Sequence, residues 1–141
     1  MNPPVHAGLI ALSTPTGWAG VLIEGPSGSG KSDLALRAIE DGFRLVADDR
    51  VILWASGGVL FGRAPDVLHG LIEARGLGIG PAAALRMTPI VLTIECVPAE
   101  GVERLPDRAQ VERAGVNTPL LRLWPFERGA TAKLRRAIAY L

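Results

Sequence analysis

Residues 25–32, Gly-Pro-Ser-Gly-Ser-Gly-Lys-Ser, have the composition and spacing of a phosphate-binding loop, G-x-x-x-x-G-K-S. Glycines let the backbone N–H groups of such a loop point inward and cradle phosphate oxygens. The lysine of this pattern reaches the β- and γ-phosphates, and the serine hydroxyl joins the ligands of a Mg²⁺ ion. The motif therefore predicts a nucleotide-binding site made of Gly25, Pro26, Ser27, Gly28, Ser29, Gly30, Lys31 and Ser32.

The segments on either side of this loop have the pattern that the motif requires. Residues 19–24 are mostly apolar and predict a buried strand that ends at the loop. Residues 32–41 predict a helix, because Leu34, Ala35, Ala38 and Ile39 would share one face. Gly42 stands where a C-terminal cap is expected.

Two acidic residues follow the next predicted strand, which covers residues 44–47. Asp48 and Asp49 lie 17 and 18 residues after Lys31. One carboxylate can orient a metal ion, while the other accepts a proton from an attacking hydroxyl. The alternative is an exposed turn in which Arg50 balances the charge. Since a phosphate loop lies just upstream, the acids favour a role in phosphoryl transfer.

Two further sets of residues have weaker signals. In the segment 73–78, Glu73 offers a second metal contact and Arg75 a charge clamp on phosphate. Such a pattern occurs in many loops, so by itself it does not decide between function and structure. His6 lies near the start of a first predicted strand over 5–12. A histidine in this position is usually a packed or surface side chain.

The composition predicts a single globular domain over residues 1–141. The net charge of +1 gives no reason to expect nucleic acid or an acidic membrane as a partner, and 48% hydrophobic residues argue against disorder. The single cysteine, Cys96, excludes an internal disulfide and is typical of a reducing compartment. We find neither a secretory signal nor a run of ~20 apolar residues that could span a membrane. We therefore expect a cytoplasmic protein.

The remaining elements follow from apolar periodicity and from turn residues. In chain order they are a hairpin over 51–61, a short helix over 66–72, a loop over 75–81, a strand over 90–97, an irregular surface segment over 98–119, a strand over 120–123 and an amphipathic helix over 133–141. Because strands outnumber helices and a hairpin interrupts their alternation, we expect an α/β fold with a mixed sheet.

Taken together, four stretches resemble the catalytic domain of the HPr kinase/phosphorylase family. They are His6, the loop over 25–32, Leu-Val-Ala-Asp-Asp-Arg at 45–50 and Glu-Ala-Arg-Gly-Leu-Gly-Ile at 73–79. All four occur in the family's order, and the resemblance covers residues 5–80. It implies a P-loop domain similar to the nucleotide-binding part of phosphoenolpyruvate carboxykinase.

The resemblance also implies an activity and its partners. Members of this family use ATP and Mg²⁺ to phosphorylate a serine of HPr, a carrier protein of the sugar phosphotransferase system, and thereby regulate carbohydrate metabolism. Many also remove that phosphate by phosphorolysis, and members form ring-like homo-hexamers. By position, Asp49 would be the general base, Lys31 would neutralise phosphate charge, and Mg²⁺ would be held by Ser32 and Glu73 with support from Asp48. His6 and Arg75 match active-site positions of the family.

The sequence departs from the family pattern at three places. It begins close to the catalytic strand and so resembles the short, catalytic-domain-only form found in some proteobacteria. Gly80-Pro81 replaces an Ile-x-Val segment. Trp-Pro-Phe-Glu-Arg-Gly at 124–129 occupies the place of a late Arg-Pro-Gly-Arg-Asn loop, where Arg128 is the candidate for the catalytic arginine. The kinase centre stays complete, whereas phosphorolysis is left open.

Three alternatives to this interpretation stay open. A different P-loop kinase would explain Lys31 and Ser32, although not the two aspartates followed by Glu73. A GTPase-type switch would need an Asn-Lys-x-Asp segment, and the two asparagines, Asn2 and Asn117, lie in no such context. The third alternative is a nucleotide-sensing regulator that has lost catalysis.

Overall fold

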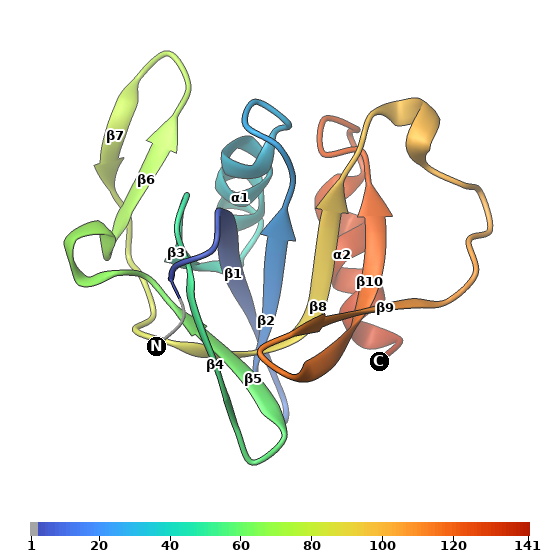
Figure 1. The fold of residues 1–141 in the computed structure, drawn as a ribbon. Coiled ribbons are helices and arrows are strands. Elements are labelled where there is room, and N and C mark those ends of the chain that lie inside the picture. Colours follow the sequence, from blue (N-terminus) through green and yellow to red (C-terminus); the bar gives the residue numbers. More distant parts are fainter. Residues whose placement is uncertain (1–2) are drawn as a thin grey trace.

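A mixed β-sheet forms the centre of the structure, a computed structural model that describes residues 3–141 (Figure 1). Two α-helices and ten strands lie within these residues. The helices are α1 (Lys31–Glu40) and α2 (Ala130–Ala139). The strands are β1 (Ala7–Thr14), β2 (Gly17–Glu24), β3 (Arg44–Ala47), β4 (Ile52–Ser56), β5 (Val59–Arg63), β6 (Leu71–Ala74), β7 (Gly78–Pro81), β8 (Thr88–Cys96), β9 (Ala109–Arg113) and β10 (Val116–Leu123).

The topology of the sheet brings several loops to one edge. The strand order is β3-β1-β2-β8-β10-β9. β8 is parallel to both β2 and β10, and β1 is antiparallel to both β2 and β3. The strands β2, β3, β8 and β10 therefore all run in one direction. Since their carboxyl ends lie at the same edge, the segments that follow them meet there, as is usual for ligand sites in α/β proteins.

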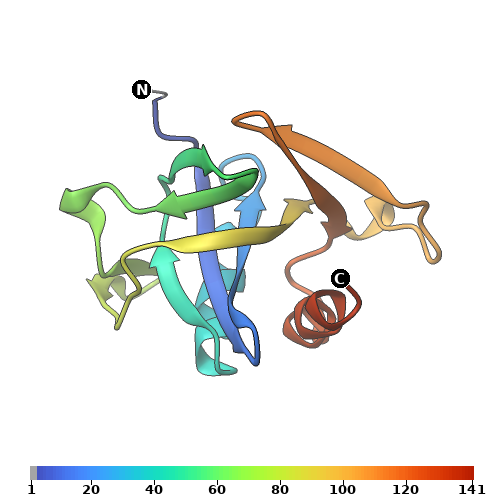
Figure 2. The same cartoon turned by 90° about the horizontal axis from the view of Figure 1, so that it is seen from below.

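The two faces of the sheet are covered differently (Figure 2). The helices α1 and α2 cover one face, where their apolar stripes pack on the sheet around Ile23, Leu34 and Leu134. The β4–β5 hairpin covers the other face, over a second cluster that includes Leu9, Leu22 and Leu60. Leu34 is fully buried on the helix that follows the phosphate loop, so we expect truncation to alanine to cost about 2–5 kcal/mol.

Much of the predicted architecture is confirmed. The α/β fold with a mixed sheet is present, the strand over 44–47 is observed with the same bounds, and the hairpin around 55–58 forms as β4 and β5. Gly42 adopts a left-handed conformation just after α1, as expected for a helix end. The amphipathic helix predicted over 133–141 is observed as α2, in which Leu134 is buried, whereas Leu141 lies beyond the helix and is exposed.

Three predictions of local structure are wrong. The helix over 66–72 is a single 3₁₀ turn, Asp66–Leu68, followed by β6. The loop over 75–81 is part of the β6–β7 hairpin, in which Gly76 and Gly78 supply positive φ angles at the turn. The irregular segment over 98–119 contains a 3₁₀ turn, Ala99–Gly101, then β9 and the start of β10. In these segments the hydrogen bonds between paired strands outweigh the tendency of glycine and polar residues to form loops. Among residues 3–141, neither helix is long and apolar enough to span a membrane.

Candidate functional site

The phosphate-loop motif lies between β2 and α1, at the edge where the four carboxyl ends meet. Its backbone follows the glycine pattern, with φ angles of 80° at Gly28 and 104° at Gly30. A Cβ on Gly30 would lie 2.8 Å from the Pro125 ring and 2.8 Å from the Phe126 ring. Both the backbone conformation and the lack of space therefore require glycine at this position.

Lys31 is folded into this loop. Its side chain is only 7% exposed, and Nζ donates hydrogen bonds to the backbone carbonyls of Gly25 at 2.8 Å and Pro26 at 3.0 Å. Within the described part of the chain the ammonium has no carboxylate at ion-pair distance. A buried cation that is balanced only by carbonyl dipoles suits the binding of an anion.

Asp48 connects three elements of the site. Its side chain is 8% exposed, and Oδ1 accepts a hydrogen bond from the Ser32 hydroxyl at 2.7 Å. Oδ2 accepts a hydrogen bond from the backbone N–H of Glu73 at 3.0 Å. The carboxylate thus joins the end of β3 to the start of α1 and to β6. Two oxygen atoms of the predicted metal set, on Ser32 and Asp48, are in direct contact.

Asp49 points to different partners from those of Asp48. It adopts a left-handed φ of 71°, and the N–H of Arg50 donates to the carbonyl of Asp48 at 2.8 Å, which closes a tight γ-like turn. The Asp49 carboxylate accepts a hydrogen bond from His6 Nε2 at 2.8 Å and pairs with Arg50 at 3.1 Å. Its side chain is 57% exposed, so a group from outside can reach it.

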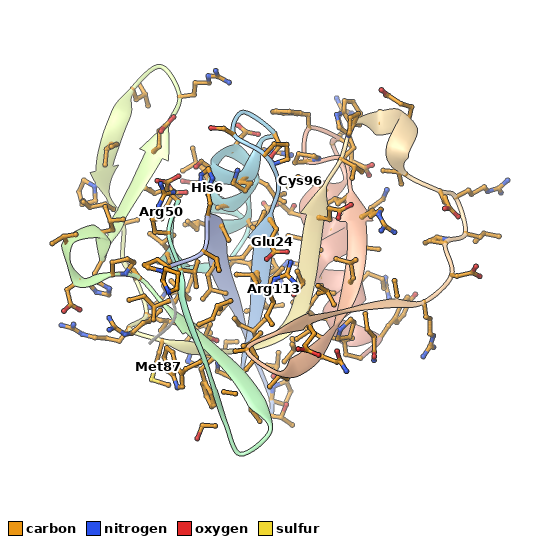
Figure 3. The ribbon with its side chains drawn as sticks, viewed as in Figure 1. His6, Glu24, Arg50, Met87, Cys96 and Arg113 are labelled. Carbon is orange, nitrogen blue, oxygen red and sulfur yellow. The ribbon has the colours of Figure 1, made fainter. Side chains whose placement is uncertain are left out.

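His6 owes its position to a short backbone pairing. Val5 and Val51 exchange two hydrogen bonds, of 2.8 and 3.0 Å, outside the regular strands. This pairing holds the segment before β1 against the segment after Asp49. As Figure 3 shows, His6 and Arg50 lie on the same side of the phosphate loop, and Cys96 lies on the other side.

The side chains of Glu73, Arg75 and Arg128 are exposed and make fewer contacts with the rest of the site. The Glu73 side chain is exposed, and only its backbone contacts Asp48. Arg75 is exposed at the turn of the β6–β7 hairpin. Arg128 is also exposed and lines a cavity of about 500 Å³ beside the second half of α1, together with Leu77 of the hairpin turn. Among residues 3–141, no group of three His, Cys, Asp or Glu side chains is placed to hold a metal ion.

Cys96 ends β8 next to the loop and is buried. Burial raises the pKa of its thiol to about 11, so the thiol stays neutral at ordinary pH. The thiolate is the reactive form of cysteine. Cys96 is therefore a packing residue rather than a nucleophile.

The contact between the segment after β10 and the phosphate loop was not predicted from the sequence. Pro125 and Phe126 lie against Gly30, and Arg37 of α1 donates hydrogen bonds to the carbonyls of Pro125 and Glu127. The apolar run Trp-Pro-Phe directly after a predicted strand was the available signal. It could not be interpreted until the position of β10 in the sheet was known.

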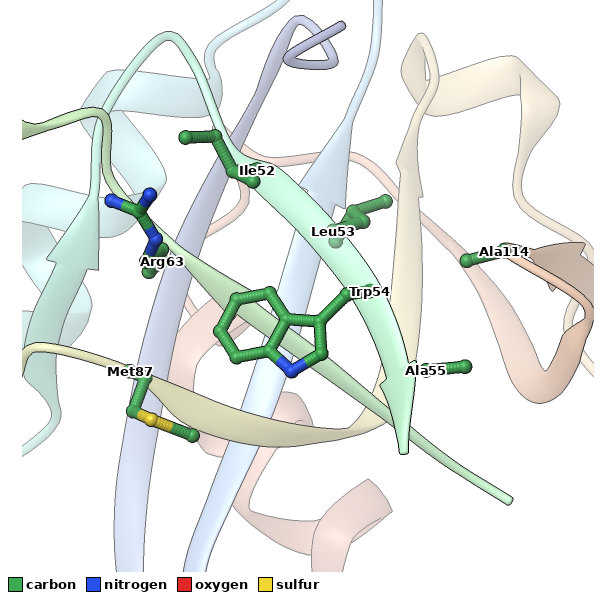
Figure 4. Close-up of a pocket in the computed structure, with 7 residues that line it drawn as sticks. All are labelled: Ile52, Leu53, Trp54, Ala55, Arg63, Met87 and Ala114. Carbon is green, nitrogen blue, oxygen red and sulfur yellow. The ribbon is translucent and has the colours of Figure 1, made fainter. Parts of the chain in front are cut away.

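A second surface depression, of about 780 Å³, lies on the β4–β5 hairpin (Figure 4). Its lining is Ile52, Leu53, Trp54, Ala55, Arg63, Met87 and Ala114. None of the predicted site residues is among them. Arg63 is the charged member of this set, and it already pairs with Asp66 at 3.3 Å. The depression therefore shows no chemistry of its own.

The fold and the site together define an α/β domain with a phosphate-loop motif and two aspartates at one edge of a mixed sheet. The family model of the HPr serine kinase C-terminal domain matches residues 5–118, and the chain belongs to this family. Residues 119–141, which include the segment after β10, lie outside that match.

Individual proteins that resemble this chain are named as members of the same family. An HPr kinase/phosphorylase of Clostridium perfringens is 39% identical over 99 residues, which are 70% of this chain and 32% of the relative. One of Streptococcus thermophilus is 38% identical over 116 residues, which cover 74% of this chain and 38% of the relative. The chain thus spans about a third of the length of these curated relatives.

The solved structure of the Hpr(Ser) kinase/phosphatase from Coxiella burnetii is similar over nearly the whole chain. It has a TM-score of 0.82 and 26% sequence identity, and the similarity covers 99% of this chain and 92% of that one. The similarity extends beyond the family match and includes the C-terminal segment after β10.

Proposed function

We propose that this chain is a kinase that transfers the γ-phosphoryl group of ATP to a serine of the carrier protein HPr. Its relatives are named HPr kinase/phosphorylase, and the sequence contains the stretches that resemble the family's active site, at His6, 25–32, 45–50 and 73–79. The observation that carries the proposal is that the two adjacent aspartates contact different parts of the site. Asp48 contacts the phosphate loop through Ser32, and Asp49 contacts His6 in a position open to an acceptor.

Mg²⁺ fits the oxygen atoms at the start of α1. The ion binds hard oxygen ligands, commonly one or two carboxylates together with phosphate oxygens and waters. The Ser32 hydroxyl and the Asp48 carboxylate, 2.7 Å apart, offer such oxygens. Glu73 is proposed as a further ligand because its backbone is bound to Asp48. Bound there, Mg²⁺ would neutralise charge on the transferring phosphate group.

We assign Asp49 as the general base. Its carboxylate would take the proton of the acceptor serine hydroxyl as the oxygen attacks the γ-phosphorus, and ADP would leave. His6 would orient this carboxylate through the hydrogen bond that it donates. In the reverse direction Asp49 would return the proton to the serine oxygen while inorganic phosphate takes the phosphoryl group and forms pyrophosphate.

The basic residues would act on the phosphates. Lys31 would exchange the carbonyls of Gly25 and Pro26 for phosphate oxygens and neutralise developing charge. Arg75 is proposed as a clamp on phosphate from the β6–β7 hairpin. Arg128 is proposed as the catalytic arginine of the late loop, and this role requires the side chain to turn from its cavity toward the phosphate loop.

The family resemblance also implies a type of nucleotide-binding domain, an oligomeric state and a cellular role. We propose a nucleotide-binding domain of the phosphoenolpyruvate carboxykinase type, a homo-hexameric assembly, and a cytoplasmic role in regulating the sugar phosphotransferase system. Sedimentation of the purified protein tests the hexamer, because a monomer of 14.9 kDa and a hexamer sediment very differently.

The kinase assay is the central experiment. Purified protein is incubated with Mg²⁺, γ-labelled ATP and purified HPr, and the product is mapped by mass spectrometry. We expect label on one HPr serine and none in the Asp49→Asn variant. If ATP binds but HPr stays unlabelled, the acceptor assignment is wrong, and another acceptor or a silent nucleotide sensor takes its place.

Lys31→Ala tests the loop in the same preparation. We expect the ATP affinity to fall by roughly 100-fold, because a buried cation in contact with phosphate is lost. Arg63→Ala is the control, since Arg63 ends β5 and pairs with Asp66, away from the predicted site residues. Unchanged ATP binding and turnover in Lys31→Ala would contradict the nucleotide site itself.

A further inference from the structure

The phosphate loop has two unlike flanks. On one side lie β1 and β3, and the end of β3 carries Asp48 and Asp49. On the other side lie the carboxyl ends of β8 and β10. A nucleotide whose terminal phosphate faces the acids must extend its sugar and base away from them. The flank formed by β8 and β10 lies on the side of the loop away from these acids.

Phe126 is the exposed aromatic residue on that flank. It follows β10, and Figure 1 shows this turn beside the phosphate loop and opposite the β6–β7 hairpin. The ring borders the loop, because its Cζ would lie 2.8 Å from a Cβ on Gly30. Yet Phe126 is 51% exposed, so a ligand beside the loop can reach this residue.

The turn that carries Phe126 is firmly held. Arg37 donates hydrogen bonds to the carbonyls on both sides of it, those of Pro125 and Glu127. Glu127 also pairs with Lys133 of α2 at 2.7 Å, and its N–H donates to the carbonyl of Trp124 at 3.3 Å. Because Arg37 belongs to the helix that starts in the phosphate loop, the backbone on both sides of Phe126 is bound to that helix.

We propose that Phe126 forms the base-binding side of the nucleotide site, where its ring stacks on the planar heteroaromatic base. This proposal rests on the nucleotide binding proposed above and adds a subsite outside the phosphate loop. Stacking needs only a π-face, which every base has, so Phe126 contributes affinity rather than discrimination between bases.

The test compares ATP with inorganic tripolyphosphate, which offers the phosphates without a base, both with Mg²⁺ and by calorimetry. In Phe126→Ala and Phe126→Leu we expect roughly tenfold weaker ATP binding, because a base–aromatic stack is lost. Tripolyphosphate binding should stay unchanged. Phe126→Trp should keep the wild-type ATP affinity. Tyr140→Ala, which removes an aromatic residue that is 77% exposed at the end of α2, should change neither.

Two results would overturn the proposal. Equal losses for ATP and tripolyphosphate would mean that the ring only supports the loop, and no loss in Phe126→Ala would mean that the base lies elsewhere. Thermal unfolding of each variant shows whether the fold is kept. The kinase assay is independent, because base-dependent ATP binding without labelled HPr would remove the acceptor assignment and leave this subsite in place.

Discussion

Two turns of the molecule each contain a non-glycine residue with a positive φ, and the two residues differ in the chemistry of their side chains. Among residues 3–141, Asp49 and Ala114 are the non-glycine residues with positive φ, at 71° and 50°. Ala114 lies in the turn between β9 and β10, followed by Gly115. Its methyl group has no chemistry. Asp49 follows β3 in a γ-like turn, where its carboxylate accepts a hydrogen bond from His6.

The comparison separates two origins of strain. A left-handed conformation costs an L-residue about 1–2 kcal/mol, and it persists where the surroundings impose it. At Ala114 the strain follows from closing a hairpin. At Asp49 it accompanies a carboxylate with partners different from those of Asp48, which would let the two adjacent residues serve the proposed metal and the proposed acceptor separately. Strain is thus informative only when the side chain has chemistry to position.

The largest effect is expected when the carboxylate of the proposed general base, Asp49, is removed while the turn at this residue is kept. Asn tolerates the left-handed region as Asp does, so Asp49→Asn should fold normally. We expect phosphorylation of HPr to fall about 10³-fold, as for loss of a general base, with ATP affinity nearly unchanged. Steady-state rates and calorimetry measure both. Turnover close to that of the wild type would show that Asp49 is not the general base.

A smaller effect is expected from removing the partner of Asp49. In His6→Ala the carboxylate loses the hydrogen bond that orients it, so the rate should fall about tenfold without a change in ATP affinity. His6→Gln, which can still donate a hydrogen bond, should recover part of the rate. If His6→Ala retains the full rate, Asp49 is positioned by its backbone turn alone.

The smallest effect concerns stability at the two turns. Ala114→Gly removes the strain at φ 50° and should raise the free energy of unfolding by about 0.5–1 kcal/mol, with no change in activity. Asp49→Gly relieves the same kind of strain but should be inactive. Urea unfolding and the kinase assay measure the pair. Loss of activity in Ala114→Gly would contradict the distinction between the two turns.

The sequence identifies the parts of the site that depend on local patterns. The phosphate loop and the strand that ends just before Asp48 are each one continuous stretch of sequence, and the family resemblance associated them with Glu73. Asp48 contacts Ser32 and the backbone of Glu73. The β6–β7 and β9–β10 hairpins were missed because their short strands gain their hydrogen bonds from partners, and glycine or charge masks the alternation. Phe126 could not be placed, since its contact with Gly30 depends on where β10 enters the sheet.

The hydrogen bonds of Arg37 also bear on how the protein folds. They join residues 88 and 90 positions apart in the chain, so the phosphate loop gains its last neighbours only after β10 has docked. Contacts of such long sequence separation form late, because loop-closure entropy must be overcome first. In native-state hydrogen exchange, we expect the amides at the start of α1 and those of the turn after β10 to open together, as one cooperative unit. The nucleotide site would then be among the last parts of the molecule to become ordered.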